Sequence, residues 1–403
     1  MYTPRQQYRS ALPLAILLAA AGAVPAAFAG TESGTKTATG TPAEAQPDAS
    51  SAAKPLSLIS AEDGHLDVSE FVDQAYGFIP VLVPITEPAV GAGLAGALAF
   101  IDKPDQKVGN VQRPNMSVLG GFATENGTQG VLAGDMRYWL DGRLQTMVGG
   151  LDATVNLDYY GADEQSALYD NPLSYALDLS GVMAQASYRI GRHSWLGLGY
   201  VIADTDAGLD SQTALPSTRD TSTTLGGLTI SATWDTRDNL FTPRGGSYLT
   251  LSNIAFDEAL GSDRDFNRVS VVGMQYLTLA PDWYMGWREM LASGSGDTPF
   301  YAKPYVYMRG VPAMRYQGDN IAQIETELTW QFHPRYSALA FVGTGAASRE
   351  IGEFSRSSDV VAGGAGMRYE IARKYGVHMG MDVAWSRDGG AVYIQFGSAW
   401  MRP

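Results

Sequence analysis

The chain has 403 residues, a formal net charge of −14 at pH 7 and no cysteine. The negative charge argues against nucleic acid or an anionic lipid surface as partner, and the lack of cysteine excludes a disulfide framework or a paired-cysteine metal site. Only 17% of the residues are charged, whereas glycine occurs 46 times and tyrosine 21 times.

Residues 1–29 predict a signal peptide that is cleaved on export. Two arginines precede the apolar run ALPLAILLAAAGAV, and an Ala-Phe-Ala cleavage site follows it. The run is shorter than the roughly 20 residues that a membrane-spanning helix needs. We therefore expect an exported protein, either a soluble periplasmic β protein or a membrane barrel.

Residues 30–57 are small and polar with no aromatic residue, which predicts a disordered linker. Residues 58–77 predict a short N-terminal periplasmic segment with an amphipathic helix from Leu66 to Gln74. Four side chains of this segment fall at ligand positions of a calcium loop: Asp63, His65, Asp67 and Glu70. The first and third positions are Ile59 and Ala61, which provide no side-chain ligand, so we expect no metal here.

From residue 78 to 403 the pattern changes to alternating apolar and polar residues, which predicts a transmembrane β-barrel. Most of the predicted strands reach the roughly 9 to 11 residues that a tilted membrane strand requires. Soluble sandwiches favour strands of about five or six residues. The predicted strands lie at 89–101, 115–124, 128–139, 143–159, 175–190, 193–205, 221–236, 246–257, 266–280, 283–295, 321–332, 336–347, 358–371, 377–387 and 391–401.

A sixteenth strand is expected at residues 78–85, because single-chain bacterial barrels have an even number of strands. Pro80 and Pro84 would confine this strand to a weakly paired position. We expect an all-β antiparallel barrel of sixteen strands. Fourteen is the alternative, if two of the shorter predicted strands are one.

Loop lengths predict the orientation of the barrel. Short turns alternate with long connections at 160–174, 206–220 and 296–320, and barrels place long loops outside the cell. The connection at 296–320 is therefore expected to start from the extracellular side. It carries Arg309 and Arg315.

The strand after this loop, at 321–332, has one polar and one nearly apolar face. Glu325 and Glu327 lie on the polar face, which we expect to point inward. Because a charge held away from bulk water is costly unless it is paired, we expect the arginine-bearing loop to fold back onto this strand.

Two motifs in this region resemble those of a known family. The loop sequence Met308-Arg309-Gly310-Val311 resembles the V-R-G-[FY] motif in the inward-folded loop of the BamA/TamA superfamily, the bacterial surface-antigen barrels that insert or export outer-membrane proteins. The later sequence Phe341-Val342-Gly343-Thr344-Gly345 resembles the F-x-[DG]-x-G motif of the same family. The likeness covers roughly residues 77 to 403 and is closest to members that lack POTRA domains.

The resemblance implies a tether for the loop arginine. Family members with Asp in the middle of the second motif use it to hold that arginine, but Gly343 supplies no carboxylate. Glu325 or Glu327 is therefore the expected partner of Arg309. The first and last strands of the insertases that this chain resembles separate to admit substrate, and Gly397 near the C-terminus would weaken pairing at that place.

The closing strand at 391–401 is expected to point five side chains outward: Val392, Ile394, Phe396, Ser398 and Trp400. Trp400 belongs to a larger group of aromatic residues near strand ends, which we interpret as belts at the two membrane interfaces.

The resemblance implies a bacterial outer-membrane barrel that assists insertion or translocation of polypeptide or lipid. Its expected partners are outer-membrane lipids and an unfolded outer-membrane or secreted polypeptide, and we expect a monomer without cofactor or metal. A passive or gated pore, plugged by the 297–320 loop, is one alternative. A lipid-modifying enzyme is a second; we do not expect an enzyme, because no nucleophile motif is present and His378 has no serine or acid near it in sequence.

Overall fold

The computed structural model describes residues 58–74, 77–101, 107–108, 111–112, 115–161, 166–209, 222–350 and 358–400. The expected signal peptide and linker, residues 1–57, lie outside the described residues, as do the last three residues of the chain. Within the described ranges, no helix is long and apolar enough to cross a membrane.

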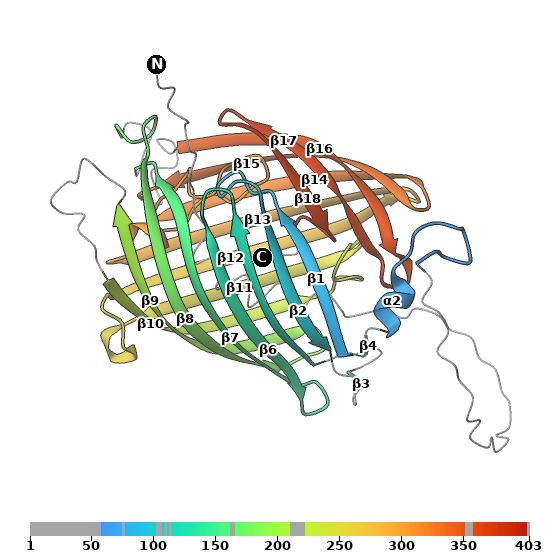
Figure 1. Ribbon diagram of the computed structural model, residues 1–403, viewed down its shortest axis with the longest axis horizontal. Helices are drawn as coiled ribbons and strands as arrows, with labels where there is room; N and C mark the ends of the chain where they lie inside the picture. Colours follow the sequence, from blue (N-terminus) through green and yellow to red (C-terminus); the bar gives the residue numbers. More distant parts are fainter. Residues whose placement is uncertain are drawn as a thin grey trace.

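Sixteen strands form one antiparallel sheet that curls into a barrel (Figure 1), which confirms the predicted fold class and strand number. Each strand pairs with its neighbours in chain order. The strands are β1 (Gly77–Ile85), β2 (Gly93–Ile101), β5 (Met116–Thr124), β6 (Gln129–Trp139), β7 (Leu144–Tyr159), β8 (Leu173–Arg189), β9 (Ser194–Leu209), β10 (Ser222–Asp235), β11 (Gly246–Phe256), β12 (Phe266–Ala280), β13 (Trp283–Gly296), β14 (Asn320–His333), β15 (Tyr336–Ser348), β16 (Ser358–Ala372), β17 (Val377–Ser386) and β18 (Gly389–Phe396).

The remaining elements are short. They are the helix α2 (Ser69–Gln74), the 3₁₀ turns η2 (Glu258–Leu260), η3 (Phe300–Ala302) and η5 (Arg373–Tyr375), and a separate pair of two-residue strands, β3 (Lys107–Val108) and β4 (Val111–Gln112). We call the end of the barrel that carries the long β13–β14 loop the outer end, and the end that carries α2 the inner end.

The last strand ends earlier than the sequence predicted, at Phe396 instead of residue 401. Gly397 adopts a positive φ of 74°, which favours glycine, and the chain then turns into the barrel. Trp400 is consequently only 3% exposed. The prediction that Trp400 points outward was wrong, because the turn at Gly397 ends the strand and its alternation of faces.

The outer surface of the barrel is apolar over the part that would face lipid. Large apolar side chains stay exposed on nearly every strand, as a hydrocarbon surrounding requires. Examples, each more than half exposed, are Leu82, Val131, Leu198, Ile230 and Val342.

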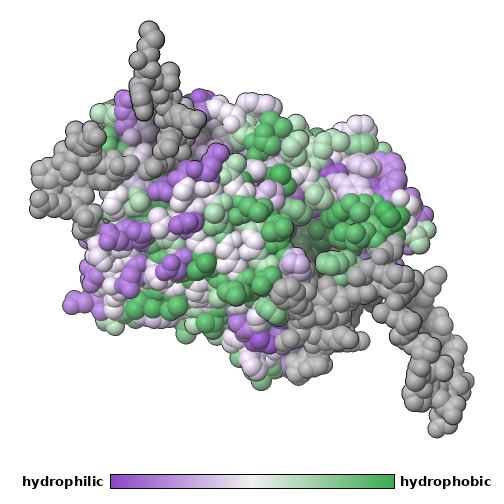
Figure 2. Space-filling model, viewed as in Figure 1, coloured by the Kyte–Doolittle hydropathy of each residue, from purple (hydrophilic) through white to green (hydrophobic). Residues whose placement is uncertain are grey.

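Four strands, β7 to β10, reverse this polarity toward the outer end. On β8, the outward-facing side chain in the middle of the strand is apolar Val182. Closer to the outer end, the outward-facing side chains are the polar Asp178 and Ser180, whereas Leu177 and Leu179 point inward. Figure 2 shows hydrophilic residues on the left of the visible wall, toward the outer ends of β8, β9 and β10. These strand ends therefore project beyond the bilayer, where water covers their outer face.

Inside the projecting part, apolar side chains of the strands and of the β13–β14 loop form a packed core. Strand residues such as Val155, Leu177 and Leu225 are almost fully buried, and they pack with Tyr301 and Met314 from the loop. Aromatic contacts continue the packing, since the Phe300 ring lies edge-on to two tyrosine rings of β7 and β8. The outer half of the lumen is thus filled by side chains.

The first and last strands, β1 and β18, are the two ends of the sheet. Every other pair of neighbouring strands forms a ladder, with register shifts in β12–β13, β14–β15 and β16–β17, but the sheet order places no ladder between β1 and β18 in the described residues. Ile394 N of β18 donates to Thr86 Oγ1 just after β1, at 3.3 Å, where the two edges meet. We call this junction the seam.

Candidate functional site: the loop arginine and the lumen

The loop between β13 and β14 folds into the lumen as a hairpin. Tyr305 and Gln317 form a bridge, and Val306 N donates to Tyr316 O at 2.9 Å. Val306 is fully buried. The side-chain amide of Gln323 on β14 fixes the loop backbone, because it both donates to and accepts from Tyr307 at 2.7 Å.

Arg309 lies at the centre of the lumen against both predicted carboxylates. Its Nε and Nη2 are 2.9 and 2.6 Å from Glu325 Oε1, and its Nη1 is 2.8 Å from Glu327 Oε2. A third carboxylate, Asp382 on β17, lies 2.8 Å from Nη1. Burial alone would lower the pKa of Arg309, but the three carboxylates raise it above its usual range, so the guanidinium stays charged.

Two further arginines complete this group. Arg368 of β16 contacts both oxygens of Asp382, at 2.5 and 2.9 Å, and Arg288 of β13 is the cross-strand neighbour of Glu325. We call the six residues the lumen charge cluster: Arg288, Arg309, Arg368, Glu325, Glu327 and Asp382. Three positive and three negative charges balance, which a buried cluster of ions requires.

The strand motif on β15 packs directly against the loop motif. The guanidinium carbon of Arg309 lies 3.6 Å from the centre of the Phe341 ring, in cation–π contact. A Cβ at Gly343 would come within 3.0 Å of Met308 Sδ and 2.8 Å of Ile324 O, and one at Gly345 within 2.5 Å of Val306. Phe341 is therefore a platform for the arginine, and the two glycines leave room for the loop.

The end of the loop motif reaches the seam. Gly310 has a φ of 85°, and its N–H donates to Tyr393 Oη of β18 at 2.9 Å. Val311 and Met308 are buried among apolar side chains of β13 to β16. The structure therefore brings all the motif residues that the sequence singled out into one contact region.

The C-terminal segment enters the same region from below β18. Trp400 Nε1 donates to Glu325 Oε1 at 2.7 Å, the oxygen that Arg309 also contacts. Ser398 N donates to Phe241 O in the β10–β11 turn at 2.5 Å. The last strand is thereby connected to the lumen charge cluster.

Arg315, the other loop arginine, lies at the outer mouth and not in the cluster. Its Nε is 3.1 Å from Asp388 Oδ1 in the β17–β18 turn, and its guanidinium stacks on Tyr169 of the β7–β8 loop at 4.0 Å. Tyr316 Oη donates to the other Asp388 oxygen at 2.6 Å. These contacts join the β13–β14 loop to the β7–β8 loop and the β17–β18 turn at the outer mouth.

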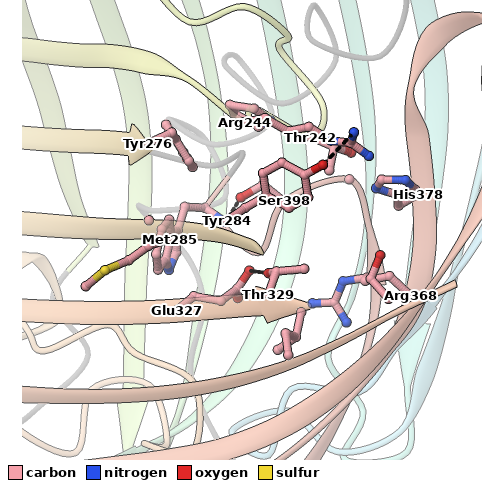
Figure 3. Close-up of a pocket in the computed structure, with 16 residues that line it drawn as sticks. Thr242, Arg244, Tyr276, Tyr284, Met285, Glu327, Thr329, Arg368, His378 and Ser398 are labelled. Atoms are coloured by element: carbon pink, nitrogen blue, oxygen red, sulfur yellow. Dashed lines mark hydrogen bonds between the residues drawn. The ribbon is translucent and has the colours of Figure 1, made fainter. Parts of the chain in front are cut away.

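A pocket lies on the inner side of the charge cluster (Figure 3). His378 and Arg368 lie on one side and Tyr276 and Glu327 on the other, and Arg244 Nη1 contacts Tyr284 Oη above them at 3.1 Å. The structure brings an acid toward His378 that the sequence did not reveal, but Glu370 Oε1 is 3.9 Å from Nε2, beyond hydrogen-bond distance. Across the described ranges, no group of three or more acids and histidines could hold a metal ion.

Four partners of the loop were not predicted from the sequence: Asp382, Arg368, Tyr393 and Trp400. An inward-facing aspartate in the apolar strand HMGMDVAWS was a signal that could have identified Asp382 as paired. The possible calcium ligands Asp63 and Asp67 instead bind Arg335, in the β14–β15 turn.

The fold and the site together define a class of protein. It is a sixteen-stranded transmembrane barrel in which an arginine-bearing loop folds inward and is held at the wall.

Comparisons with known proteins point to one superfamily. Residues 137–306 of this chain match the Omp85 superfamily domain. BamA from Haemophilus ducreyi lacking POTRA domains 1–3 has a similar structure, with a TM-score of 0.56 and 10% sequence identity over 79% of this chain and 68% of that one. CdiB from Escherichia coli gives a TM-score of 0.56 at 13% identity, over 79% of this chain and 61% of that one.

A second CdiB structure, from Acinetobacter baumannii, gives a TM-score of 0.53 at 8% identity, with 79% of this chain and 59% of that chain covered. The chain thus spans only about three fifths of the CdiB structures. At these identities the likeness shows the fold, and no curated protein matches the sequence.

Proposed function

We propose that this barrel assists the insertion or translocation of polypeptide or lipid across the outer membrane through the seam between β1 and β18. The proposal rests on the seam, because these two strands form no ladder with each other in the part of the chain that the structure describes. In lipid, each unpaired backbone N–H or C=O costs several kcal/mol, so a barrel edge without a partner strand is unfavourable. A client strand that pairs with such an edge would relieve that cost.

Contacts between the seam and the lumen support this function. β18 is joined to the loop by the Gly310–Tyr393 hydrogen bond and, through its C-terminal extension, to Glu325 by Trp400. Movement of β18 at the seam would therefore disturb the carboxylate that holds Arg309. The loop and the seam would respond to a client together.

A passive pore is less well supported. The apolar core of β7 to β12 packs with the loop inside the outer part of the barrel, and Arg315 joins the β13–β14 loop to two other loops at the mouth. A pore would need the loop to leave. Steady conductance of a small solute through the purified protein, without any client, would favour the pore.

An enzyme is also less well supported, and the proposal assigns no catalytic residue. Ser398 and His378 both line the pocket, but the described contacts of His378 include no hydroxyl donor or acceptor. A nucleophile and its base must lie within hydrogen-bond reach of each other. The proposal further includes export through a cleaved signal peptide, a monomeric state and an unfolded polypeptide as client.

The proposal is tested by locking the seam. Thr86→Cys with Ile394→Cys introduces the only two thiols of the chain, and a short cleavable thiol–thiol crosslinker would join β1 to β18. In a strain that lacks the protein, the wild type and the uncrosslinked double variant should restore the normal protein and lipid content of the outer membrane. The crosslinked variant should fail until the crosslink is cleaved.

The matched control is a crosslink between two strands that are already paired. Thr233 on β10 and Thr250 on β11 face each other with their hydroxyl oxygens 3.1 Å apart. Crosslinking cysteines at these two positions should leave the function intact. If the seam-locked barrel restored the membrane as fully as this control, passage through the seam would be excluded.

A further inference from the structure

Arg335 occupies the tight turn between β14 and β15 at the inner end, yet it is only 1% exposed. The N-terminal segment covers it. Asp63 contacts it with both oxygens, at 2.6 Å to Nε and 2.9 Å to Nη2, and Asp67 Oδ2 lies 2.8 Å from Nη1. In the described part of the chain, both carboxylates that pair with Arg335 come from this segment.

Three further hydrogen bonds dock the same segment on the end of β16 and on the turn that follows it. Val68 N donates to Ile371 O at 2.8 Å, and Tyr369 Oη donates to Leu66 O at 2.6 Å. Lys374 N donates to Ser69 Oγ at 3.2 Å. These contacts span about 300 residues of sequence and tie the start of the barrel to its last strands.

The segment is a compact loop and not an extended tail. Asp67 N donates to Leu58 O at 2.9 Å, Ser60 N donates to His65 O at 2.8 Å, and Ile59 bridges Leu66. This internal pairing places both aspartates on the side that faces Arg335.

The segment comes directly before the first strand of the barrel, so its contacts also restrain that strand. Its helix α2 ends at Gln74, and β1 begins at Gly77. β1 is one edge of the seam, whereas Arg335 and Ile371 belong to the sheet on the other side of it. Figure 1 shows α2 at the inner end, near the start of β1 and the end of β16.

We infer that residues 58–74 form a strap that crosses the seam at its inner end and holds it closed. On one side the strap is continuous with β1, and on the other it is bound through Arg335 and the backbone of β16. Movement of the inner end of β1 away from β16 therefore requires the strap to leave Arg335.

Asp63 and Asp67 should leave Arg335 together, because both contact the same guanidinium. A planar guanidinium with a two-oxygen contact to one carboxylate and a further contact to a second is held in a fixed geometry. Removing the carboxylates would leave a buried cation without a counter-charge, which is strongly unfavourable. Neutralising the two aspartates should therefore release the strap.

The test uses a chain that has no natural cysteine, so introduced thiols are unique reporters. Thr86→Cys with Ile394→Cys reports seam closure by the rate of reaction with a short crosslinker, and Val68→Cys alone reports docking of the strap by its rate of labelling. Both are measured on the full chain in native outer membranes, with and without Asp63→Asn/Asp67→Asn.

The matched control is Asp141→Asn/Asp282→Asn, which neutralises two exposed carboxylates in other turns at the inner end. With the strap aspartates neutralised, we expect labelling at Val68→Cys to rise and seam crosslinking to slow about tenfold, equivalent to about 1.4 kcal/mol of closing free energy. The control should change neither rate, and unheated gel migration should show that every variant is folded.

Two results would overturn the inference. Faster labelling of Val68→Cys with unchanged seam crosslinking would show that the strap leaves without opening the seam. Unchanged labelling would show that the aspartates do not hold the strap. Neither readout needs a client polypeptide or lipid. The strap can therefore be disproved while the proposed passage through the seam remains supported. Passage through the seam can likewise be disproved while the strap remains supported.

Discussion

At the scale of single residues, Arg309 has the most demanding surroundings, since it is 7% exposed and contacts three carboxylates. Replacing it with alanine would leave Glu325 and Asp382 buried with fewer partners. We expect Arg309→Ala to lower the free energy of unfolding by about 3 kcal/mol, the low end of the range for breaking a buried pair. Arg368 and Trp400 would still contact these two acids.

Unfolding by urea, followed by tryptophan fluorescence in lipid vesicles, measures this loss. Arg309→Lys should recover little of it, because one ammonium cannot reproduce the planar contacts of a guanidinium. The exposed turn residue Arg192 provides the control, and Arg192→Ala should change stability by less than about 0.5 kcal/mol. Equal stability of the two alanine variants would show that Arg309 is solvated.

Gly343 gives a second prediction at this scale. A methyl group there would approach Ile324 O to 2.8 Å and Met308 Sδ to 3.0 Å. Overpacking of this kind costs typically about 1 to 3 kcal/mol, so Gly343→Ala should destabilise the barrel by that amount.

The matched control is Gly149→Ala on β7, where the nearest atoms to the added methyl group, Ala133 O and Met183 Cγ, lie at 3.6 and 3.8 Å. These are ordinary contacts, so urea unfolding of this variant should match the wild type. If Gly343→Ala unfolded at the same urea concentration as Gly149→Ala, the loop would not pack closely against β15 at Gly343.

At the scale of elements, the strap should respond to acid. The hydrogen bond from Arg335 holds the pKa of Asp63 well below its usual range. Burial would raise the pKa of Asp67, but hydrogen bonds from Ser69 and Arg335 bring it below its usual value. Because both pKa values are lowered in the folded state, their stabilisation is complete above the unfolded value of about 3.9 and is lost as the pH falls through the lowered values.

We therefore expect the labelling rate at Val68→Cys, corrected for thiol ionisation, to stay constant from pH 8 to about pH 5 and to rise only below about pH 4. Other charged groups also face the strap: Arg373 lies 3.2 Å from Asp63 and 3.4 Å from Glu370, and the His65 and His333 rings are 5.9 Å apart. A His65→Gln background removes the contact between the imidazoles. A rise near pH 6 in that background would contradict the assignment to the aspartates.

The strands were predictable from the sequence because a membrane wall imposes alternation on every strand. Most boundaries lie within a few residues of the prediction, for example 266–280 for β12. The first strand after β1 begins at Gly93 and not at residue 89, because residues 87–91 form a turn in which Val90 N and Gly91 N bond to Glu87 O. The helix is shorter than predicted, since its first residues dock as extended chain on Ile371.

The partners of Arg309 were only partly predictable. Glu325 and Glu327 lie close to the loop in sequence and point inward on the same strand. The alternation of side chains along that strand and the family resemblance therefore both indicated them as partners of Arg309. Asp382 is 73 residues away and meets Arg309 across the lumen, which depends on barrel closure and not on local pattern. Trp400 was predicted on the wrong side because the single positive φ at Gly397 redirects the chain.

At the scale of the whole molecule, a barrel whose sixteen strands are joined by fifteen hydrogen-bonded ladders should resist detergent until it is heated. We expect unheated and boiled samples to migrate differently on a denaturing gel. Identical migration, together with solubility in the absence of detergent, would rule out a membrane barrel.

The seam between β1 and β18 is the weak junction of a barrel whose other neighbouring strands are paired. Amide hydrogen exchange in lipid vesicles measures this weakness, because exchange rates report the opening free energy of each strand. We expect amides of β1 and β18 to exchange on the order of ten times faster than those of the paired strands β12 and β13. Exchange in β1 and β18 as slow as in β12 and β13 would show a closed ladder at the seam and exclude a weak junction there.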